Sequence, residues 1–368
     1  MSDWKCAAID HGVTIFPNGK IGPCCLIDSS YLKPISELTN PNRFKDLYQT
    51  DGSPPLACAV CTQSESYSSL SYRTMFEQQR TLAPGLQFVD IRNTNLCNLK
   101  CRSCGPHYSS KWGDELGYTN AIKKQDIQEH LPYLLTDDLH WMYFTGGEPL
   151  IVKDHWDILE QLINSDRAKN IKLMYNTNLT TLKFKDKDIV SIWKQFKQVL
   201  INCSLDAAGP EIDYIRSGSN WTEILQNFKT LHTIGQTHRH ITLNISPTIS
   251  VLNIWFFAEL VRFAHEHKVQ CKPFVLAGPH AFVLSVIPDS LTAQALQQLD
   301  QANEFNWVDK SVIEHMRELV INNNLKHTFD RTLVEIMFMD KIRRESLFDM
   351  LPFQDHVLSG VHKFDEYQ

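Results

Sequence analysis

The sequence predicts an α/β protein whose core is a partial (β/α)6 barrel. A small cysteine-rich domain is expected before this barrel and a helical extension after it. Between residues 86 and 277, short apolar runs alternate with amphipathic segments of helical spacing, which is typical of parallel βαβ units. The first part of the chain is rich in turn-forming residues, and the pattern beyond Asp289 is helical. We therefore predict three domains, at residues 1–82, 83–288 and 289–368.

The amino-terminal domain is expected to be small and turn-rich. The stretches FPNGKIGPCC, TNPNR and DGSPP bring Gly, Pro, Asn and Asp together at close intervals, and these residues favour turns. We predict short strands here and one helix from about Ser36 to Tyr48.

Six strands and four helices are predicted for the barrel, which is fewer than a complete eight-fold barrel contains. The expected strands are 87–93, 140–147, 170–178, 198–206, 240–250 and 269–278. The expected helices are 155–165, 189–196, 221–235, which Gly235 should end, and 253–268. Three further helices are expected near 290–304, 310–322 and 326–347, followed by an extended tail.

Composition places the chain among ordinary globular proteins. Apolar residues make up 43% of it and charged residues 21%. The net charge is −6 and no long basic run occurs, which argues against a nucleic-acid partner. The first residues, MSDWKCAAIDHG, contain no apolar signal core, and no apolar stretch is long enough to span a membrane. We predict a cytoplasmic protein without a membrane partner.

Ten cysteines are many for a protein of that compartment. Cytosolic thiols are kept reduced, so a disulfide framework is not expected. With Cys25 left aside, seven of the ten lie within the first 104 residues. The other two are Cys203, which is predicted to be a core residue, and Cys271. Clustered cysteines in a reducing compartment indicate a metal site or an iron–sulfur cluster.

Cys97, Cys101 and Cys104 follow the first predicted barrel strand, where parallel α/β folds place their sites. Thiolates at such spacing suit iron–sulfur ligation or zinc. Three ligands would leave one iron of a four-iron cluster open to a substrate or cofactor. A structural zinc site completed by His107 is the alternative.

The spacing Cys97-x3-Cys101-x2-Cys104 resembles the signature of the radical S-adenosylmethionine (SAM) superfamily. This resemblance implies a 4Fe-4S cluster whose open iron is chelated by SAM. It also implies that one electron cleaves SAM to a 5′-deoxyadenosyl radical, which abstracts hydrogen from a substrate. The protein's tasks are then to hold SAM, to orient the substrate and to exclude water.

Further motifs resemble that family in the same order along residues 86–277. They imply that Gly146, Gly147 and Glu148 of TGGEP, Asn178 of YNTN, Ser204 and Asp206 of SLD, and Arg216 of YIRSG contact SAM. In this comparison the glycines meet its amino group, and Arg216 pairs with its carboxylate. One departure is Ser103, because the family often has an aromatic residue before the last cysteine.

The amino-terminal cysteines Cys6, Cys24, Cys58 and Cys61 could form a saturated four-thiolate site. Their spacing resembles the twitch domain, a one-cluster relative of the SPASM domain, which normally follows the barrel rather than preceding it. The resemblance implies a second, auxiliary 4Fe-4S cluster. Cys25 could replace Cys24 as the ligand, and a zinc ribbon is the alternative site.

The chain is accordingly predicted to be a radical SAM enzyme, an oxidoreductase with two clusters. A reductant such as flavodoxin or ferredoxin is implied. A peptide or protein side chain is the preferred substrate, and a two-cluster dehydrogenase of carbohydrates or alcohols is the alternative. An RNA-modifying enzyme is less favoured on charge. A rival of another class is a non-catalytic, metal-stabilised binding protein.

Overall fold

The computed structural model describes residues 4–67, 71–346, 350, 351 and 353, and a nine-stranded sheet lies at its centre. The strand order is β12-β10-β9-β6-β5-β4-β1-β2-β3. All six predicted barrel strands form and run parallel, which confirms the α/β partial barrel. They are β4 (Phe88–Ile91), β5 (Trp141–Phe144), β6 (Lys172–Thr177), β9 (Gln198–Cys203), β10 (Ile241–Ile245) and β12 (Gln270–Cys271).

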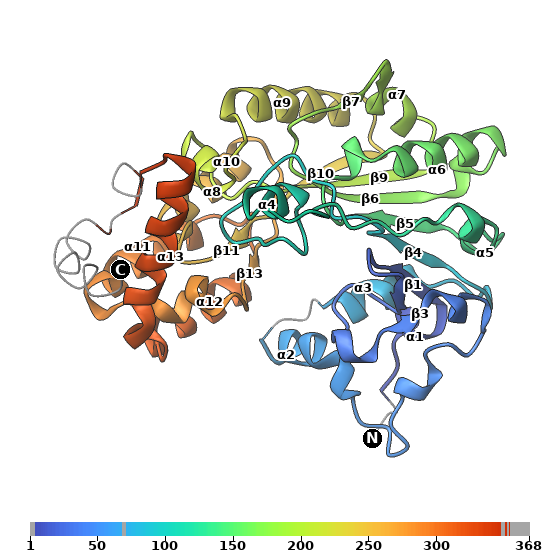
Figure 1. The fold of residues 1–368 in the computed structure, drawn as a ribbon, viewed down its shortest axis with the longest axis horizontal. Coiled ribbons are helices and arrows are strands. Elements are labelled where there is room, and N and C mark those ends of the chain that lie inside the picture. Colours follow the sequence, from blue (N-terminus) through green and yellow to red (C-terminus); the bar gives the residue numbers. More distant parts are fainter. Residues whose placement is uncertain (1–3, 68–70, 347–349, 352, 354–368) are drawn as a thin grey trace.

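Helices α6 (Lys153–Asn164), α7 (Ile189–Trp193) and α9 (Trp221–Thr237) cover one face of the sheet (Figure 1). Phe144 of β5 and Tyr175 of β6 pack edge-on against His155 of α6, with ring centroids 4.7 Å and 5.4 Å away. The helix α10 (Phe257–Glu266) follows β10, as predicted.

Gly235 does not end α9, contrary to the prediction, because the helix continues to Thr237. A Cβ atom at Gly235 would lie 3.0 Å from the carbonyl oxygen of Ile241. The glycine therefore allows the helix to pack closely against the start of β10, and it is not a stop signal.

The opposite face of the sheet, which we call the inner face, carries polar side chains. Asp90 lies beside Tyr143 in register, and Asn176 lies beside Asn202, which lies beside Asn244. Since side chains alternate along a strand, these residues point away from the helices that contact Phe144 and Tyr175. The three asparagine amides form a hydrogen-bonded row, with distances of 3.0 Å and 3.1 Å.

The amino-terminal segment extends this same sheet, which the sequence did not predict. β1 (Gly12–Ile15) lies parallel to β4, with Thr14 opposite Asp90. Two short antiparallel strands follow, and three helices surround them. These elements are β2 (Lys20–Gly22), β3 (Lys33–Pro34), α1 (Ala7–His11), α2 (Ala59–Tyr67) and α3 (Tyr72–Gln79). The division into domains at residue 82 stays a prediction.

The helix predicted from Ser36 to Tyr48 does not form. Two 3-10 turns, Ile35–Thr39 and Lys45–Leu47, take its place. The chain leaves the first turn at Asn40, directly before Pro41, and a proline disfavours helical conformation in the residue that precedes it.

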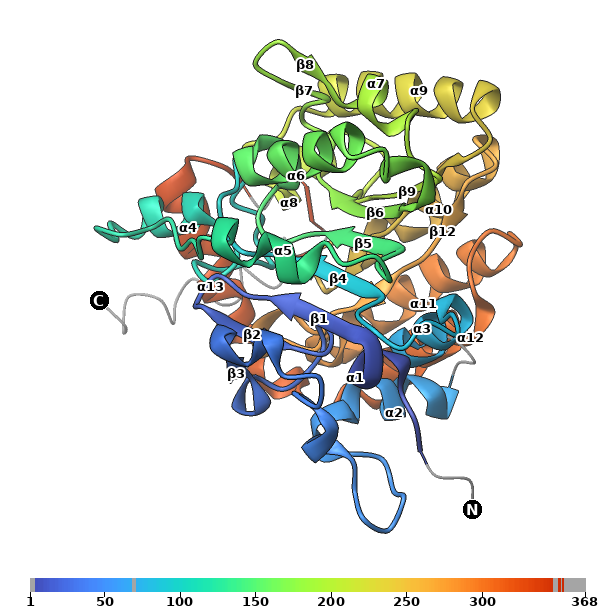
Figure 2. The same ribbon diagram turned by 90° about the vertical axis from the view of Figure 1, so that its right-hand side faces the viewer.

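The carboxyl-terminal helices confirm the predicted helical extension. They are α11 (Asp289–Asn303), α12 (Lys310–Asn322) and α13 (Phe329–Arg343). Figure 2 shows α13 beside α4 (Ser110–Glu115), on the side toward which β1 and β4 point. The predicted tail lies almost wholly outside the described residues.

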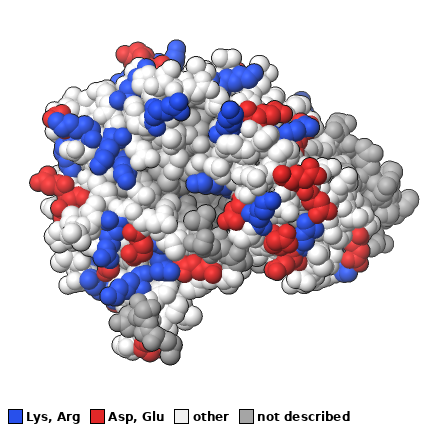
Figure 3. All heavy atoms as spheres, turned by 180° about the vertical axis from the view of Figure 1, so that it is seen from behind, with Lys and Arg blue, Asp and Glu red and all other residues white. Residues whose placement is uncertain are grey.

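Within the described part of the chain, no helix is both long and apolar enough to cross a membrane. Figure 3 shows one face of the molecule. Lysine and arginine predominate over the left half of this view, whereas acidic and basic side chains are mixed over the right half. The sequence did not predict this uneven distribution of charge.

Candidate functional site

The three predicted cluster cysteines lie on a single loop, residues 97–104, which we call the cysteine loop. It follows β4, which ends at Ile91. Cys97, Cys101 and Cys104 are free and half-buried. The loop turns where the backbone N–H of Cys104 donates to the carbonyl of Cys101 at 3.0 Å. The thiols therefore lie at the carboxyl edge of the parallel sheet, where active sites of such folds are found.

Electrostatics indicate that these thiols are close neighbours. Burial and, to a lesser extent, the charge of Cys101 together raise the pKa of Cys97 and of Cys104 to about 12. Burial also raises the pKa of Cys101, while the guanidinium of Arg216, with Nη1 3.9 Å from Sγ, opposes that rise. A cationic metal group would let all three thiols ionise together.

The glycines of the TGGEP stretch pack against the backbone of the segment that leads into the cysteine loop. The amide of Gly147 donates to the carbonyl of Thr94 at 3.2 Å, and that of Glu148 to the carbonyl of Leu96 at 2.8 Å. A Cβ atom on Gly147 would lie only 2.0 Å from the Leu96 carbonyl oxygen. Gly146 has a φ of +101°, which favours glycine. Close approach of two backbones is therefore sufficient reason for both glycines.

Glu148 is buried and ties the ends of two strands together. Its carboxylate accepts hydrogen bonds from the amide of Leu150 at 3.1 Å, the hydroxyl of Thr177 at 2.9 Å and the amide of Asn178 at 2.7 Å. Burial nevertheless raises the pKa of Glu148 to about 7, because these bonds only partly offset the loss of hydration.

This shift of the pKa predicts a pH-dependent stability that Glu148→Gln should remove. Between the unfolded pKa of 4.5 and the folded pKa of about 7, the folded protein holds the proton more tightly than the unfolded chain does. The stabilising contribution is complete below pH 4.5 and is lost as pH rises to 7. Relative to Glu148→Gln, the wild type should lose about 3 kcal/mol across this window. Urea unfolding at several pH values checks this, and parallel curves for the two proteins would contradict it.

Asn178, predicted to contact SAM, joins the end of β6 to the cysteine loop. Its Nδ2 donates to Oδ1 of Asn98 at 2.9 Å, and its Oδ1 accepts from the amide of Thr180 at 3.0 Å. Asn98 in turn donates to the hydroxyl of Thr180 at 2.7 Å. The structure thus brings Asn178 to the predicted site, where it contacts the cysteine loop.

Asp206 and Arg216 form an ion pair, with Nε 2.8 Å from Oδ2, and both side chains are largely buried. Asp206 also accepts from the amide of Thr248 at 2.8 Å, which fixes the carboxylate. Ser204 is half-buried after β9, and its amide donates to the carbonyl of Thr177 at 2.9 Å. Arg216 therefore bridges Asp206 and Cys101, and its predicted contact with a carboxylate of SAM stays a proposal.

The four amino-terminal cysteines meet in one apolar pocket, although they are far apart in sequence. Cys6, Cys24, Cys58 and Cys61 all line it, together with aromatic side chains that include Trp4. Burial raises the pKa of each thiol. The charges of Cys25, Cys6 and Cys61 also raise the pKa of Cys24, and those of Cys6 and Cys61 raise the pKa of Cys58. The four thiols therefore line one pocket, and their assignment as ligands of one site stays a prediction.

Cys25 faces a different environment from Cys24. Burial raises its pKa to about 12, and the charges that act on it are those of Arg92 and Asp90. Its thiol also contacts Tyr72, and Cys25 is absent from the lining of the four-thiol pocket. Of the two adjacent cysteines, the geometry thus favours Cys24 as the fourth ligand.

Residues 91–264 match the family described as the Radical SAM superfamily. The chain carries a radical SAM domain. The matched region begins at the last residue of β4 and includes the cysteine loop, Gly146, Gly147, Glu148 and Arg216.

Several named proteins are similar in sequence to part of this chain. GTP 3′,8-cyclase of Campylobacter lari is 23% identical over 61% of this chain and 66% of its own length. GTP 3′,8-cyclase of Actinobacillus succinogenes is 25% identical over 50% of this chain and 52% of its own. 7-carboxy-7-deazaguanine synthase of Thermoplasma acidophilum is 29% identical over 29% of this chain and 46% of its own length. The chain thus spans between 46% and 66% of the length of these relatives.

Among solved structures, one described as native anSMEcpe with bound AdoMet aligns with 15% identity and a TM-score of 0.39. The alignment covers 58% of this chain and 59% of that chain. No argument below rests on it.

The residues of the cysteine loop fit the 4Fe-4S cluster that a radical SAM domain implies. Three free thiols of soft-donor chemistry lie on one loop, with the Arg216 guanidinium beside Cys101. Across the described residues, no three Cys, His, Asp or Glu side chains converge as ligands of one ion. Cluster thiolates attach to separate irons, so such convergence is not required of them. His107, the ligand of the zinc alternative, is exposed.

Asp90, on the inner face of the sheet, is a site residue that sequence reasoning missed. It pairs with Arg92 at 2.9 Å and accepts from the hydroxyl of Thr145, the residue before Gly146, at 3.2 Å. Tyr72 of α3 and Tyr143 of β5 meet nearby, with their hydroxyls 3.4 Å apart. A lone carboxylate within the apolar strand FVDI was the signal in the sequence.

Proposed function

We propose that this protein cleaves SAM reductively and uses the resulting radical to abstract hydrogen from a small polar substrate. The observation that carries the proposal is the meeting of three sequence motifs in one place. The cysteine loop, the glycine segment and the end of β6 are hydrogen-bonded to one another through Glu148 and Asn178. This joining lies wholly within the matched residues 91–264.

The residues of the site have separate tasks in this proposal. Cys97, Cys101 and Cys104 hold the cluster, and Arg216 receives the carboxylate of SAM while Asp206 fixes its orientation. A cluster held by these three thiols would supply one-electron reduction of the sulfonium of SAM. The Gly146–Gly147 backbone and Glu148 bind the amino group, for which a buried carboxylate is a suitable acceptor. A flavodoxin- or ferredoxin-type protein would supply the electron.

We further propose that Cys6, Cys24, Cys58 and Cys61 hold an auxiliary cluster, in the manner of a twitch domain. Four thiols gathered in an apolar pocket support this assignment, because four thiolates saturate a 4Fe-4S cluster. The N-terminal segment also reaches the inner face of the sheet through Tyr72, which contacts Tyr143. An auxiliary cluster here would exchange electrons with a substrate bound at that face.

The two adjacent cysteines provide a matched test of the auxiliary site. Cys24→Ser should lower the iron content of the anaerobically reconstituted protein from about eight toward about four per chain. Cys25→Ser should leave it unchanged, because its side chain faces Asp90 and Tyr72. Equal iron in both variants would refute the assignment of Cys24, and zinc in place of iron would support the zinc ribbon.

A small polar molecule is the substrate class that we favour over the peptide expected from sequence. The inner face presents the amide row of Asn176, Asn202 and Asn244, whose groups donate and accept hydrogen bonds without carrying charge. The names of the relatives refer to GTP and to 7-carboxy-7-deazaguanine, and none of the three refers to a peptide. A purine or purine nucleotide fits both observations.

Substrate-dependent SAM cleavage tests this proposal. Under anaerobic conditions with dithionite, 5′-deoxyadenosine formation would be followed with a panel of purine nucleotides and a panel of short peptides. Stimulation by a purine is the expected result, and stimulation by peptides alone would support a peptide as the substrate. Zinc in both sites with no SAM cleavage would favour a non-catalytic binding protein.

A further inference from the structure

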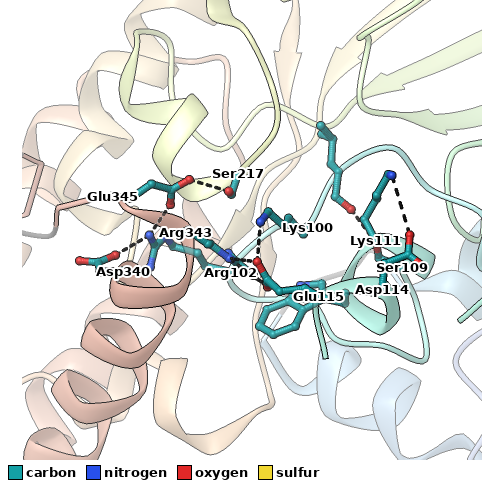
Figure 4. Close-up of polar contacts among 12 residues, drawn as sticks. Lys100, Arg102, Ser109, Lys111, Asp114, Glu115, Ser217, Asp340, Arg343 and Glu345 are labelled. Carbon is teal, nitrogen blue, oxygen red and sulfur yellow. Dashed lines mark hydrogen bonds and ion pairs between the residues drawn. The ribbon is translucent and has the colours of Figure 1, made fainter. Parts of the chain in front are cut away.

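Arg102 lies inside the cysteine loop, between Cys101 and Cys104, and its side chain is completely buried. Nη2 contacts Oδ1 of Asp340 and Oε2 of Glu345, both at 2.5 Å (Figure 4). Asp340 belongs to α13, and it lies 238 residues away in the sequence. A buried arginine is costly unless it is paired, so the loop depends on carboxylates from the far end of the chain.

A second buried arginine comes from α13 itself. Nε and Nη2 of Arg343 bind both carboxylate oxygens of Glu115 at 3.1 Å and 2.8 Å, and Glu115 also pairs with Lys100 of the loop. The Arg343 guanidinium lies 4.5 Å from the ring centroid of Trp112, whose Nε1 donates to the carbonyl of Cys101 at 2.8 Å. Arg343 is thus linked to Cys101 through two side chains.

The backbone of the loop is held from a further side by the segment that carries Arg216. The amide of Lys100 donates to the carbonyl of Ser217 at 3.0 Å, and that of Arg102 to Ile215 at 2.9 Å. The hydroxyl of Ser217 donates to Glu345 at 2.6 Å, so this segment and the end of α13 are themselves joined (Figure 4).

We propose that Arg102 and Arg343 are positioning residues, through which α13 holds the cysteine loop ready to accept its cluster and places a positive charge beside Cys101. The presence of a cluster rests on the proposed function, whereas the fixing of the loop by α13 does not. Neighbouring groups that orient metal ligands commonly govern affinity and redox behaviour. This assigns a function to the carboxyl-terminal extension.

The charge of Arg343 lies close to the cysteine loop. Its guanidinium lies 4.5 Å from the ring centroid of Trp112, whose Nε1 donates to the carbonyl of Cys101 at 2.8 Å. Net charge near an iron–sulfur cluster shifts its reduction potential. Removing the cation of Arg343 should therefore lower the potential of the cluster, and removing the anion of Glu115 should raise it.

The two partners of this one ion pair allow positioning and charge to be separated. Arg343→Met and Glu115→Gln both break the pair, so both should accelerate hydrogen exchange in residues 97–115 of the cluster-free protein, by about tenfold. After reconstitution, the cluster whose EPR signal responds to SAM should shift in potential in opposite directions in the two variants. Arg343→Lys keeps the charge and should restore most of both properties.

Arg317→Met is the control, because Arg317 pairs with Asp300 at 2.6 Å on the neighbouring helices without contact to the loop. It should leave exchange in residues 97–115 and the potential unchanged. Unchanged exchange in Arg343→Met, or a uniform rise over the whole chain, would overturn the positioning role. Shifts of potential in the same direction for Arg343→Met and Glu115→Gln would overturn the charge role. The exchange measurement stands even if no cluster forms.

Discussion

Replacement of Cys97, Cys101 and Cys104 by alanine is expected to abolish SAM cleavage completely. The three thiols are the ligands available on the cysteine loop, and their loss removes the proposed cluster while the auxiliary site keeps its four thiols. Iron should fall from about eight to about four per chain. Anaerobic iron and sulfide analysis, together with the yield of 5′-deoxyadenosine under dithionite, measures both changes.

Cys203→Ala is the matched control for this experiment. Cys203 is a buried cysteine of β9, within the same radical SAM domain, and it packs in the core as the sequence predicted. Its replacement should leave iron content and SAM cleavage at the wild-type level. If the triple variant retained eight irons or still produced 5′-deoxyadenosine, the cysteine loop would not be the site of SAM cleavage.

Gly147→Ala is expected to have the largest effect of any substitution that adds a single methyl group at the site. The new Cβ would lie 2.0 Å from the carbonyl oxygen of Leu96 and 2.8 Å from the carbonyl carbon of Asn95. Both are backbone atoms, so no side chain can turn aside to relieve the contact. Destabilisation of about 3 kcal/mol or more is expected, at the upper end of the cost of overpacking. Urea unfolding of the cluster-free protein measures it.

Gly105→Ala supplies the comparison, because a Cβ at Gly105, directly after the cysteine loop, would meet no atom within 4 Å. We expect its stability to stay near that of the wild type and its SAM cleavage to be retained. If the two alanine variants were equally stable, the close approach between Gly147 and Leu96 would not exist in solution.

The barrel strands were predictable because their signals are local, and the same holds for the position of the cysteine loop, whose ligand role stays a prediction. Apolar runs such as WMYF end in polar or glycine residues, and thiols at short spacing identify a cluster loop from a few residues. The predicted positions of Glu148 and Asn178 also proved to lie together with the cysteine loop. Here local pattern and tertiary structure agree.

Other features were not predictable, because they depend on partners far away in the sequence. Arg102 in the stretch CRSC has no local sign of burial, and its carboxylate partners follow more than two hundred residues later. The strand β1 consists of only four residues, and its pairing with β4 leaves no trace in the periodicity of either. The 3-10 turns in place of a helix at residues 36–48 reflect Pro41, which the helical pattern concealed.

The position of β1 in the sheet has a consequence for how the protein can be made and divided. Because β1 covers the edge of β4, a fragment that lacks residues 1–82 would expose the unpaired backbone groups of Phe88–Ile91. Such an edge pairs readily with another chain, so we expect this fragment to self-associate. On the ribosome, β1 must likewise wait until residues 88–91 have emerged. The segment that carries β1 therefore cannot complete its folding before β4 is available.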